Sequence, residues 1–206
     1  MQKTVILVVK LLKLTRSKIR HPFDFLICYF IFYSNGVKFS TFKNIGWPKV
    51  NVGMGGTCII AKNFRLNNRE MSNPIGRFNR CSIIVGKKGE LIIGCNVGMS
   101  STAIVCHDRI EIGDNVNIGG NVVIYDTDFH SLNAQDRSIR SLDIEKTKTR
   151  PVKIGDNVFI GAHSTILKGV SIGANSIVGA CSLVSQSIPD NEIWGGNPAK
   201  KIRDVQ

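Results

Sequence analysis

The chain has 206 residues, 43% of them hydrophobic, which suits one domain with a small appendage. Its net charge of +12 is concentrated in the first hundred residues, which hold 16 Lys and Arg against 3 Asp and Glu. This excess favours an anionic partner such as a membrane surface, a phosphorylated cofactor or an acidic polysaccharide. No helix-turn-helix or RNP pattern accompanies the charge, which argues against nucleic acid as the partner.

The N-terminal segment 1–44 is expected to be a separate unit. Residues 1–20 are predicted to form a basic amphipathic helix that ends at His21-Pro22. Residues 23–33 form an apolar, aromatic run that is too short to span a bilayer, which needs about 20 residues. We expect this unit to cap the open end of the next domain. In-plane contact with an anionic membrane is the alternative role, and the two roles are compatible.

Residues 45–206 are expected to form a repeat domain. An aliphatic residue recurs every six positions, at 112, 118, 124, 154, 160, 166, 172, 178 and 184. This period fits neither an amphipathic helix nor a two-sided strand, and it is typical of a parallel β-helix. Each hexapeptide supplies one face with its aliphatic residue pointing inward, and three faces complete a coil of about eighteen residues. Gly and Asn near the corners tolerate the positive φ that a sharp turn requires.

The six cysteines stand at positions 28, 58, 81, 95, 106 and 181 without a CxxC pair, and no Cys/His cluster has zinc-site spacing. No secretory signal with a cleavage site is recognisable. We therefore expect reduced, mostly buried thiols, no bound metal and a cytoplasmic location.

The six-residue register is interrupted at about 129–151 by a long polar and charged segment. It is entered through Thr127-Asp128-Phe129-His130 and left through Arg150-Pro151. A long polar insertion has no packing purpose in a regular solenoid, and such loops usually carry function. We therefore place the chemistry of the protein at this loop.

Residues 91–203 resemble the hexapeptide-repeat acyltransferases. The similarity is greatest to the branch that contains galactoside, maltose, nodulation and capsule-sugar O-acetyltransferases and the streptogramin acetyltransferases. It rests on the repeat, on Thr127–His130, on the run Pro151–Gly161, and on Ile188-Pro189 followed by Gly196-Asn197-Pro198-Ala199-Lys200. The resemblance implies an all-β fold, a left-handed parallel β-helix, whose hand departs from the usual right-handed crossover. It also implies a homotrimer that holds acetyl-CoA, the co-substrate, in a groove between two subunits.

The resemblance assigns His130 the role of general base. A neutral imidazole near pH 7 can take the proton of a sugar hydroxyl while the oxygen attacks the thioester carbonyl. Direct attack gives a tetrahedral oxyanion without an acyl-enzyme. We expect a sugar or glycan acceptor, bound by Met99, His107, Asp108 and Asp128. Met99 and His107 stand where galactoside and maltose enzymes carry an Asn and an acidic residue, which argues against galactoside-type specificity.

The resemblance also implies, by position, which residues contact the cofactor. Small residues let the pantetheine arm come close, and basic residues suit its phosphates. These residues are Phe159, Gly161, Ala162, Gly179, Ala180, Ser185, Lys200, Lys201 and Arg203.

Other functions remain as alternatives. An amino-sugar N-acetyltransferase or a small-molecule acetyltransferase would use the same base. A glycan-binding solenoid is the non-enzyme alternative, against which the complete loop argues. A β-helical zinc carbonic anhydrase needs two closely spaced His, and the four His at 21, 107, 130 and 163 contain no such pair. A serine acetyltransferase needs a long helical N-terminal domain, which residues 1–44 do not supply.

Overall fold

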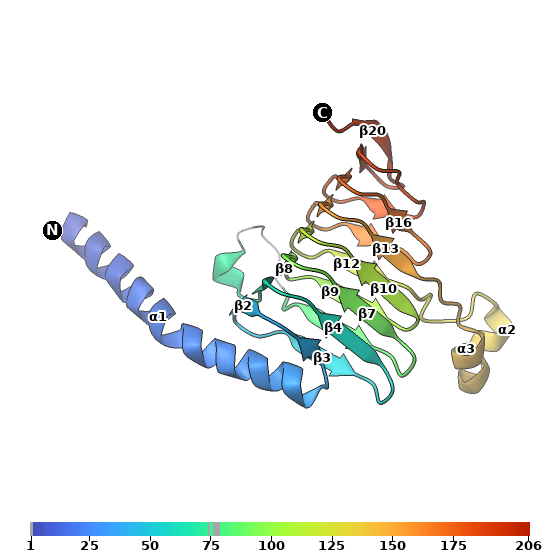
Figure 1. Cartoon of the computed structure of the whole chain (residues 1–206), viewed down its shortest axis with the longest axis horizontal. Helices are drawn as coiled ribbons and strands as arrows, with labels where there is room; N and C mark the ends of the chain where they lie inside the picture. The colour runs from blue at the N-terminus through green and yellow to red at the C-terminus, as the bar shows by residue number, and fades with distance from the viewer. Residues whose placement is uncertain (1, 74, 76–78) are drawn as a thin grey trace.

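The computed structural model describes residues 2–73, 75 and 79–206 and shows a three-sided β-helix with a long helix at its N-terminal end (Figure 1). Each full coil contributes one strand to each of three sheets. Sheet 1 contains β1 (Lys38–Phe39), β4 (Thr57–Ile60), β7 (Glu90–Ile93), β10 (Arg109–Ile112), β13 (Val152–Ile154) and β16 (Ser171–Ile172). Sheet 2 contains β2 (Phe42–Ile45), β5 (Phe64–Asn67), β8 (Gly98–Ser100), β11 (Asn117–Ile118), β14 (Phe159–Ile160), β17 (Ile177–Val178), β19 (Glu192–Gly195) and β20 (Lys200–Asp204). Sheet 3 contains β3 (Lys49–Val52), β6 (Ser82–Val85), β9 (Ala103–Cys106), β12 (Val123–Tyr125), β15 (Thr165–Ile166) and β18 (Leu183–Val184). The described strands pair in parallel, except that β20 returns antiparallel to β19.

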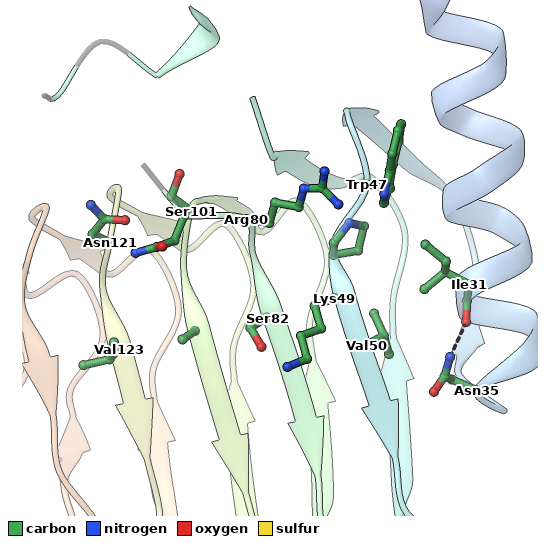
Figure 2. A pocket seen from close by; sticks show the side chains of 13 residues that line it. Ile31, Asn35, Trp47, Lys49, Val50, Arg80, Ser82, Ser101, Asn121 and Val123 are labelled. Atoms are coloured by element: carbon green, nitrogen blue, oxygen red, sulfur yellow. Dashed lines mark hydrogen bonds between the residues drawn. The ribbon is translucent and has the colours of Figure 1, made fainter. Parts of the chain in front are cut away.

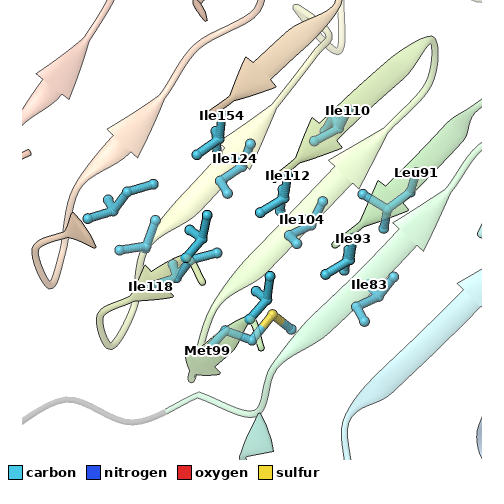
Figure 3. Packing of buried hydrophobic residues seen from close by; sticks show 14 of the residues in the cluster. Ile83, Leu91, Ile93, Met99, Ile104, Ile110, Ile112, Ile118, Ile124 and Ile154 are labelled. Atoms are coloured by element: carbon cyan, nitrogen blue, oxygen red, sulfur yellow. The ribbon is translucent and has the colours of Figure 1, made fainter. Parts of the chain in front are cut away.

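The core is a set of stacked aliphatic columns inside the coils. Residues eighteen positions apart lie above one another, since Ile154 pairs with Ile172 and Ile160 with Val178. The nine aliphatic residues predicted to point inward are all at most 4% exposed. Figure 3 shows part of this packing between the sheets. Each fully buried side chain contributes about 1.5–3 kcal/mol, so this core is the main source of stability. The predicted parallel β-helix is confirmed.

One corner of the coils, between sheets 1 and 2, is built from asparagines in the left-handed conformation, with φ between 59° and 61°. Asn can adopt this conformation because its short polar side chain forms local hydrogen bonds. Each side-chain amide donates to the side-chain oxygen of the Asn in the next coil, at 2.9–3.2 Å. We call this row the asparagine ladder; it consists of Asn63, Asn96, Asn115, Asn157, Asn175 and Asn191.

The N-terminal helix α1 (Gln2–Ser34) is a single helix of 33 residues with Pro22 inside it. The predicted end at His21-Pro22 is therefore wrong. Pro22 removes one helical hydrogen bond, but the turns after it are held by packing. Asp24, Cys28 and Phe32 lie four residues apart and are at most 4% exposed. They form the side of the helix that covers the first coil.

Aromatic and ionic contacts fix α1 on this coil. Phe32 packs edge-on against Phe42, with ring centres 5.2 Å apart. The Asp24 carboxylate accepts hydrogen bonds from Arg69 at 2.6 and 2.8 Å and from the backbone N–H of Gly46 at 3.0 Å. A buried carboxylate needs such partners, because removing one of them leaves an uncompensated charge.

Only the second half of α1 has the predicted capping position. Residues 2–23 extend away from the coils (Figure 1), and all their described side chains are exposed. The side chains of Lys13, Arg16 and Lys18, part of the predicted basic face, lie outside the described part of the structure. Within that part, no helix combines the length and the apolarity that crossing a membrane requires.

The predicted loop lies between β12 and β13 and contains two short helices, α2 (Ala134–Arg137) and α3 (Arg140–Lys146). It projects from the corner between sheets 3 and 1 (Figure 1). A bridge between Thr127 and Thr149 closes its base. β10 and β13 still pair in register, with Ile112 beside Ile154, so the loop does not disturb the stacking of the coils.

Candidate active site

His130 lies in the loop, and Asp143 on α3 holds its ring. The Nδ1 atom of His130 is 2.7 Å from Oδ2 of Asp143, and Oδ1 accepts the backbone N–H of Ser131 at 2.7 Å. The hydrogen bond from His130 and then that from Ser131 hold the pKa of Asp143 below its usual range. An ionised carboxylate can only accept, so Nδ1 carries the proton and Nε2 of the neutral ring keeps a free lone pair.

Asp143 is a site residue that the sequence analysis missed. The loop contains other acidic residues at comparable distances along the chain, so spacing alone did not distinguish it. In the structure Asp136 accepts from the Ser131 hydroxyl at 3.0 Å, and Glu145 pairs with Lys146 at 3.1 Å. The folding of α3 selects Asp143 as the partner of His130.

The residue before His130 connects the loop to the coil below. Phe129 has φ +63°, an uncommon conformation for a bulky residue. Its ring packs edge-on against Tyr125, at 5.0 Å between ring centres, and against His107 at 6.4 Å. His107, predicted to contact the acceptor, is thereby placed beside the base of the loop. The His130 side chain itself is 68% exposed, so its free nitrogen is accessible.

The turn that carries His107 and Asp108 is fixed by Asp126, a second residue that the sequence analysis did not single out. The Asp126 carboxylate accepts the backbone N–H groups of His107 and Asp108 at 2.7 and 2.8 Å. Asp126 is fully buried. It therefore positions the two residues predicted to contact the acceptor and is not itself exposed to a ligand.

Two other predicted acceptor residues occupy different positions. Asp128 forms an ion pair with Lys168 of the next coil at 3.3 Å, so a cation already matches its charge near the loop base. Met99 lies in the core and is 2% exposed (Figure 3). The prediction that the Met99 side chain contacts the acceptor is therefore not supported, because Met99 is the central residue of β8 and the one whose side chain points into the core.

Five residues predicted to contact the cofactor lie along the edge of sheet 2. Phe159 is exposed on its outer face, whereas Gly161, Ala162, Gly179 and Ala180 form the corner between sheets 2 and 3. A Cβ on Gly161 would lie 2.4 Å from the backbone nitrogen of Ala180, so coil stacking already requires that glycine. A Cβ on Gly179 would have ordinary contacts, the nearest at 3.4 Å. Coil stacking therefore accounts for the glycine at position 161, whereas no contact within the described chain requires the one at position 179.

The remaining predicted cofactor residues lie near the C-terminal end of the β-helix. Ser185, Lys200 and Arg203 are exposed. Lys201 instead binds Asp204 and Glu192, each at 2.7 Å, and these partners raise the pKa of Lys201. Its charge is matched within the chain, which weakens its predicted role as a phosphate ligand.

The structure does not bring the two halves of the predicted site together within one chain. His130 projects from the corner between sheets 3 and 1, whereas Gly161 and Gly179 lie at the corner between sheets 2 and 3. The outer face of sheet 3 separates them. The two halves therefore lie apart on the surface of one chain.

Two grooves lie elsewhere on the described surface. One, of about 1110 Å³, runs between α1 and sheet 2, and its lining includes Phe159, Lys43 and Arg65. The other, of about 740 Å³, lies beside α1 on sheet 3, where the Arg80 guanidinium stacks over Trp47 at 5.1 Å (Figure 2). Neither is lined by His130. Among the described residues, no group of three or more His, Cys, Asp or Glu is placed to hold a metal ion.

Comparison with known proteins agrees with this architecture. The model of the bacterial transferase hexapeptide family (six repeats) matches residues 151–186. Over 102 residues the chain is 38% identical to galactoside O-acetyltransferase of Escherichia coli, covering 50% of this chain and 47% of that protein. A hexapeptide-repeat-containing acetyltransferase of Vibrio cholerae, solved with acetyl-coenzyme A, is 28% identical with a TM-score of 0.51, covering 75% of this chain and 70% of that one. A galactoside acetyltransferase solved with coenzyme A is 25% identical with a TM-score of 0.51, covering 91% and 83%.

These matches confirm the predicted resemblance. Residues 151–186 are hexapeptide repeats of the bacterial transferase type, and the chain around them has the left-handed parallel β-helix of the acetyltransferases that it resembles. The chain spans about half the length of the curated relatives that it matches.

Proposed function

We propose that the protein transfers an acetyl group from acetyl-CoA to a hydroxyl group of a sugar or glycan. The observation that carries this proposal is the pair formed by His130 and Asp143, which leaves an exposed imidazole nitrogen free to accept a proton. The names of the relatives support the reaction class, since the E. coli protein is a galactoside O-acetyltransferase and the V. cholerae structure contains acetyl-coenzyme A.

The proposed reaction is a direct transfer. Nε2 of His130 accepts the proton of the acceptor hydroxyl while the oxygen attacks the thioester carbonyl carbon. The resulting tetrahedral oxyanion collapses, the C–S bond breaks, and the proton on the imidazolium passes to the leaving thiolate. Asp143 stabilises the imidazolium and keeps the ring in the required tautomer, as a carboxylate does in other His-based sites.

We propose a homotrimer as the active form. Within one chain, sheet 3 separates His130 from Gly161 and Gly179, and a neighbouring subunit packed on this face supplies the missing half. The outer face of sheet 3 is suited to such packing because, from β6 to β18, its outward residues are small or apolar and half-buried. They include Ala103, Val105, Val123, Tyr125 and Leu183.

The proposed acceptor contacts are His107 and Asp108 at the loop base, and the proposed cofactor contacts are Phe159 with the exposed cations Lys200 and Arg203. Cations at the C-terminal end suit the phosphates of the cofactor. His107 provides a hydrogen-bonding ring edge and Asp108 a carboxylate, both of which can bind sugar hydroxyl groups.

The test is an acetyl-transfer assay with purified full-length protein, acetyl-CoA and a panel of sugars, glycans and amino sugars. Release of free thiol reports turnover, and lability of the product to mild base distinguishes an ester from an amide. We expect ester formation on at least one hydroxyl acceptor. The His130→Ala variant should lose this ester formation. The control is His21→Ala, which removes an exposed imidazole from α1 and should keep it. Acetyl-CoA binding without turnover on any acceptor contradicts the proposed reaction and favours a glycan-binding solenoid.

A further inference from the structure

An apolar stripe runs along the side of α1 that faces away from the β-helix. Its residues recur at intervals of seven in the first half of the helix and of three or four in the second half, so they share one side of the helix. Each is between 58% and 71% exposed, which makes the stripe an unusually apolar surface. The residues are Val5, Leu12, Ile19, Phe23, Leu26, Phe30 and Tyr33.

The stripe and the packed side of α1 point in opposite directions. At about 100° per residue, Phe23, Leu26 and Phe30 lie across the helix from Cys28 and Phe32. Cys28 and Phe32 are fully buried against the first coil. The stripe extends over about 40 Å at about 1.5 Å per residue, and a surface lying along it can contact it without touching the coils.

The positive charge of α1 indicates that the surface it contacts is anionic. Residues 2–23 contain six Lys and Arg and no Asp or Glu. Asp24, the first acidic residue of the chain, is neutralised by Arg69. Lys3 and Lys10 are exposed on the side of the helix away from the stripe, and Arg20 is exposed on its flank. Such a helix lies in the membrane interface with its apolar stripe among the acyl chains and its cations among anionic headgroups.

We infer that α1 attaches the protein peripherally to an anionic phospholipid bilayer, with the helix parallel to the membrane plane and the β-helix on the water side. A second copy of α1 is a less suitable occupant of the stripe, since it would bring two cationic, acid-free helices together. This inference concerns only α1 and does not depend on the proposed acetyl transfer.

The test is co-sedimentation of the full-length protein with vesicles of phosphatidylcholine alone or with about one third phosphatidylglycerol. We expect binding to the anionic vesicles at low salt and weaker binding at about 0.5 M salt, because surface electrostatic attraction is screened. Leu12→Glu places a charge in the stripe and is expected to weaken binding at least about tenfold.

The matched control is Ile6→Glu, which makes the same type of change on the basic side of α1, near the direction of Lys10. It carries the same charge penalty, about fivefold, without the loss of buried apolar area, so its effect should be clearly smaller than that of Leu12→Glu. Circular dichroism checks that both variants remain folded. Wild-type protein that stays in the supernatant at low salt overturns the inference, as do equal losses in the two variants. Light scattering that shows Leu12→Glu reducing the size of a vesicle-free oligomer, without vesicle binding by the wild type, assigns the stripe to contacts between copies instead.

Discussion

The pair of His130 and Asp143 gives a quantitative prediction because one residue is expected to act only through the other. His130→Ala removes the proposed base and should lower kcat by about 10²–10⁴. Asp143→Ala leaves the base in place but removes the only hydrogen-bond partner of its ring within the described residues. Since the ring is 68% exposed, little else restricts it.

The expected effect of Asp143→Ala follows from what the carboxylate provides. Without Asp143 the ring can adopt about three rotamers and two tautomers, which lowers kcat by about threefold and about twofold respectively. Losing the charge that stabilises the imidazolium costs about fivefold for an exposed pair. Together we expect kcat to fall by about thirtyfold, less than for His130→Ala. Glu145→Ala on the same helix, which removes only a surface contact to Lys146, is the control and should be active.

The decisive measurement is the double variant His130→Ala/Asp143→Ala, assayed by thiol release near pH 7. Folding lowers the pKa of Asp143, so its ionised form dominates above about pH 4 and is lost only as the pH falls through the lowered value. We expect the double variant to match His130→Ala within about threefold. If the two losses multiply instead, Asp143 does not act through His130 and the proposed dyad is wrong.

Two further predictions concern assembly and the thiols. Light scattering on the wild type should give three times the 22.7 kDa chain mass. Val123→Arg on the outer face of sheet 3 should shift the measured mass towards that of a single chain. A monomeric wild type under active conditions would contradict the shared site. Burial raises the pKa of Cys28 and Cys58 to about 12 and that of Cys81 to about 11. At pH 8 a thiol reagent should therefore label the exposed Cys181 quickly, and the three buried cysteines only after unfolding. Equally fast labelling of Cys28 in the native protein would show that α1 does not stay packed on the first coil.

The coils were predictable from sequence because their determinants are local. An aliphatic residue every six positions specifies which side chains enter the core, and positions such as Asn157 and Asn175 mark corners that need positive φ. Met99 was assigned by its resemblance to a family position and not by this pattern. The alternation within β8 turns its side chain inward, and that detail of register decides its role.

The active-site partner and the continuous helix were not predictable in this way. Asp143 reaches His130 only because α2 and α3 fold the loop back on itself, and no period in the sequence reports such a fold. The helix continues through Pro22 because Asp24, Cys28 and Phe32 find partners on the first coil, so tertiary packing outweighs the local preference for a break. The resemblance likewise assigns Lys201 to a phosphate, whereas its ion pairs with Glu192 and Asp204 match its charge within the chain.

The asparagine ladder has a consequence for how such a protein can diverge. Asn115 donates directly to Asn157 although the whole loop between β12 and β13 lies between them in the chain. The vertical alignment of the coils is therefore set at one corner, while insertions enter at another. Lengthening an inserted loop adds mainly a closure entropy that grows slowly, about 0.6 kcal/mol for each doubling. Loops of new length and composition can thus be exchanged at the corner between sheets 3 and 1 while the scaffold keeps its register.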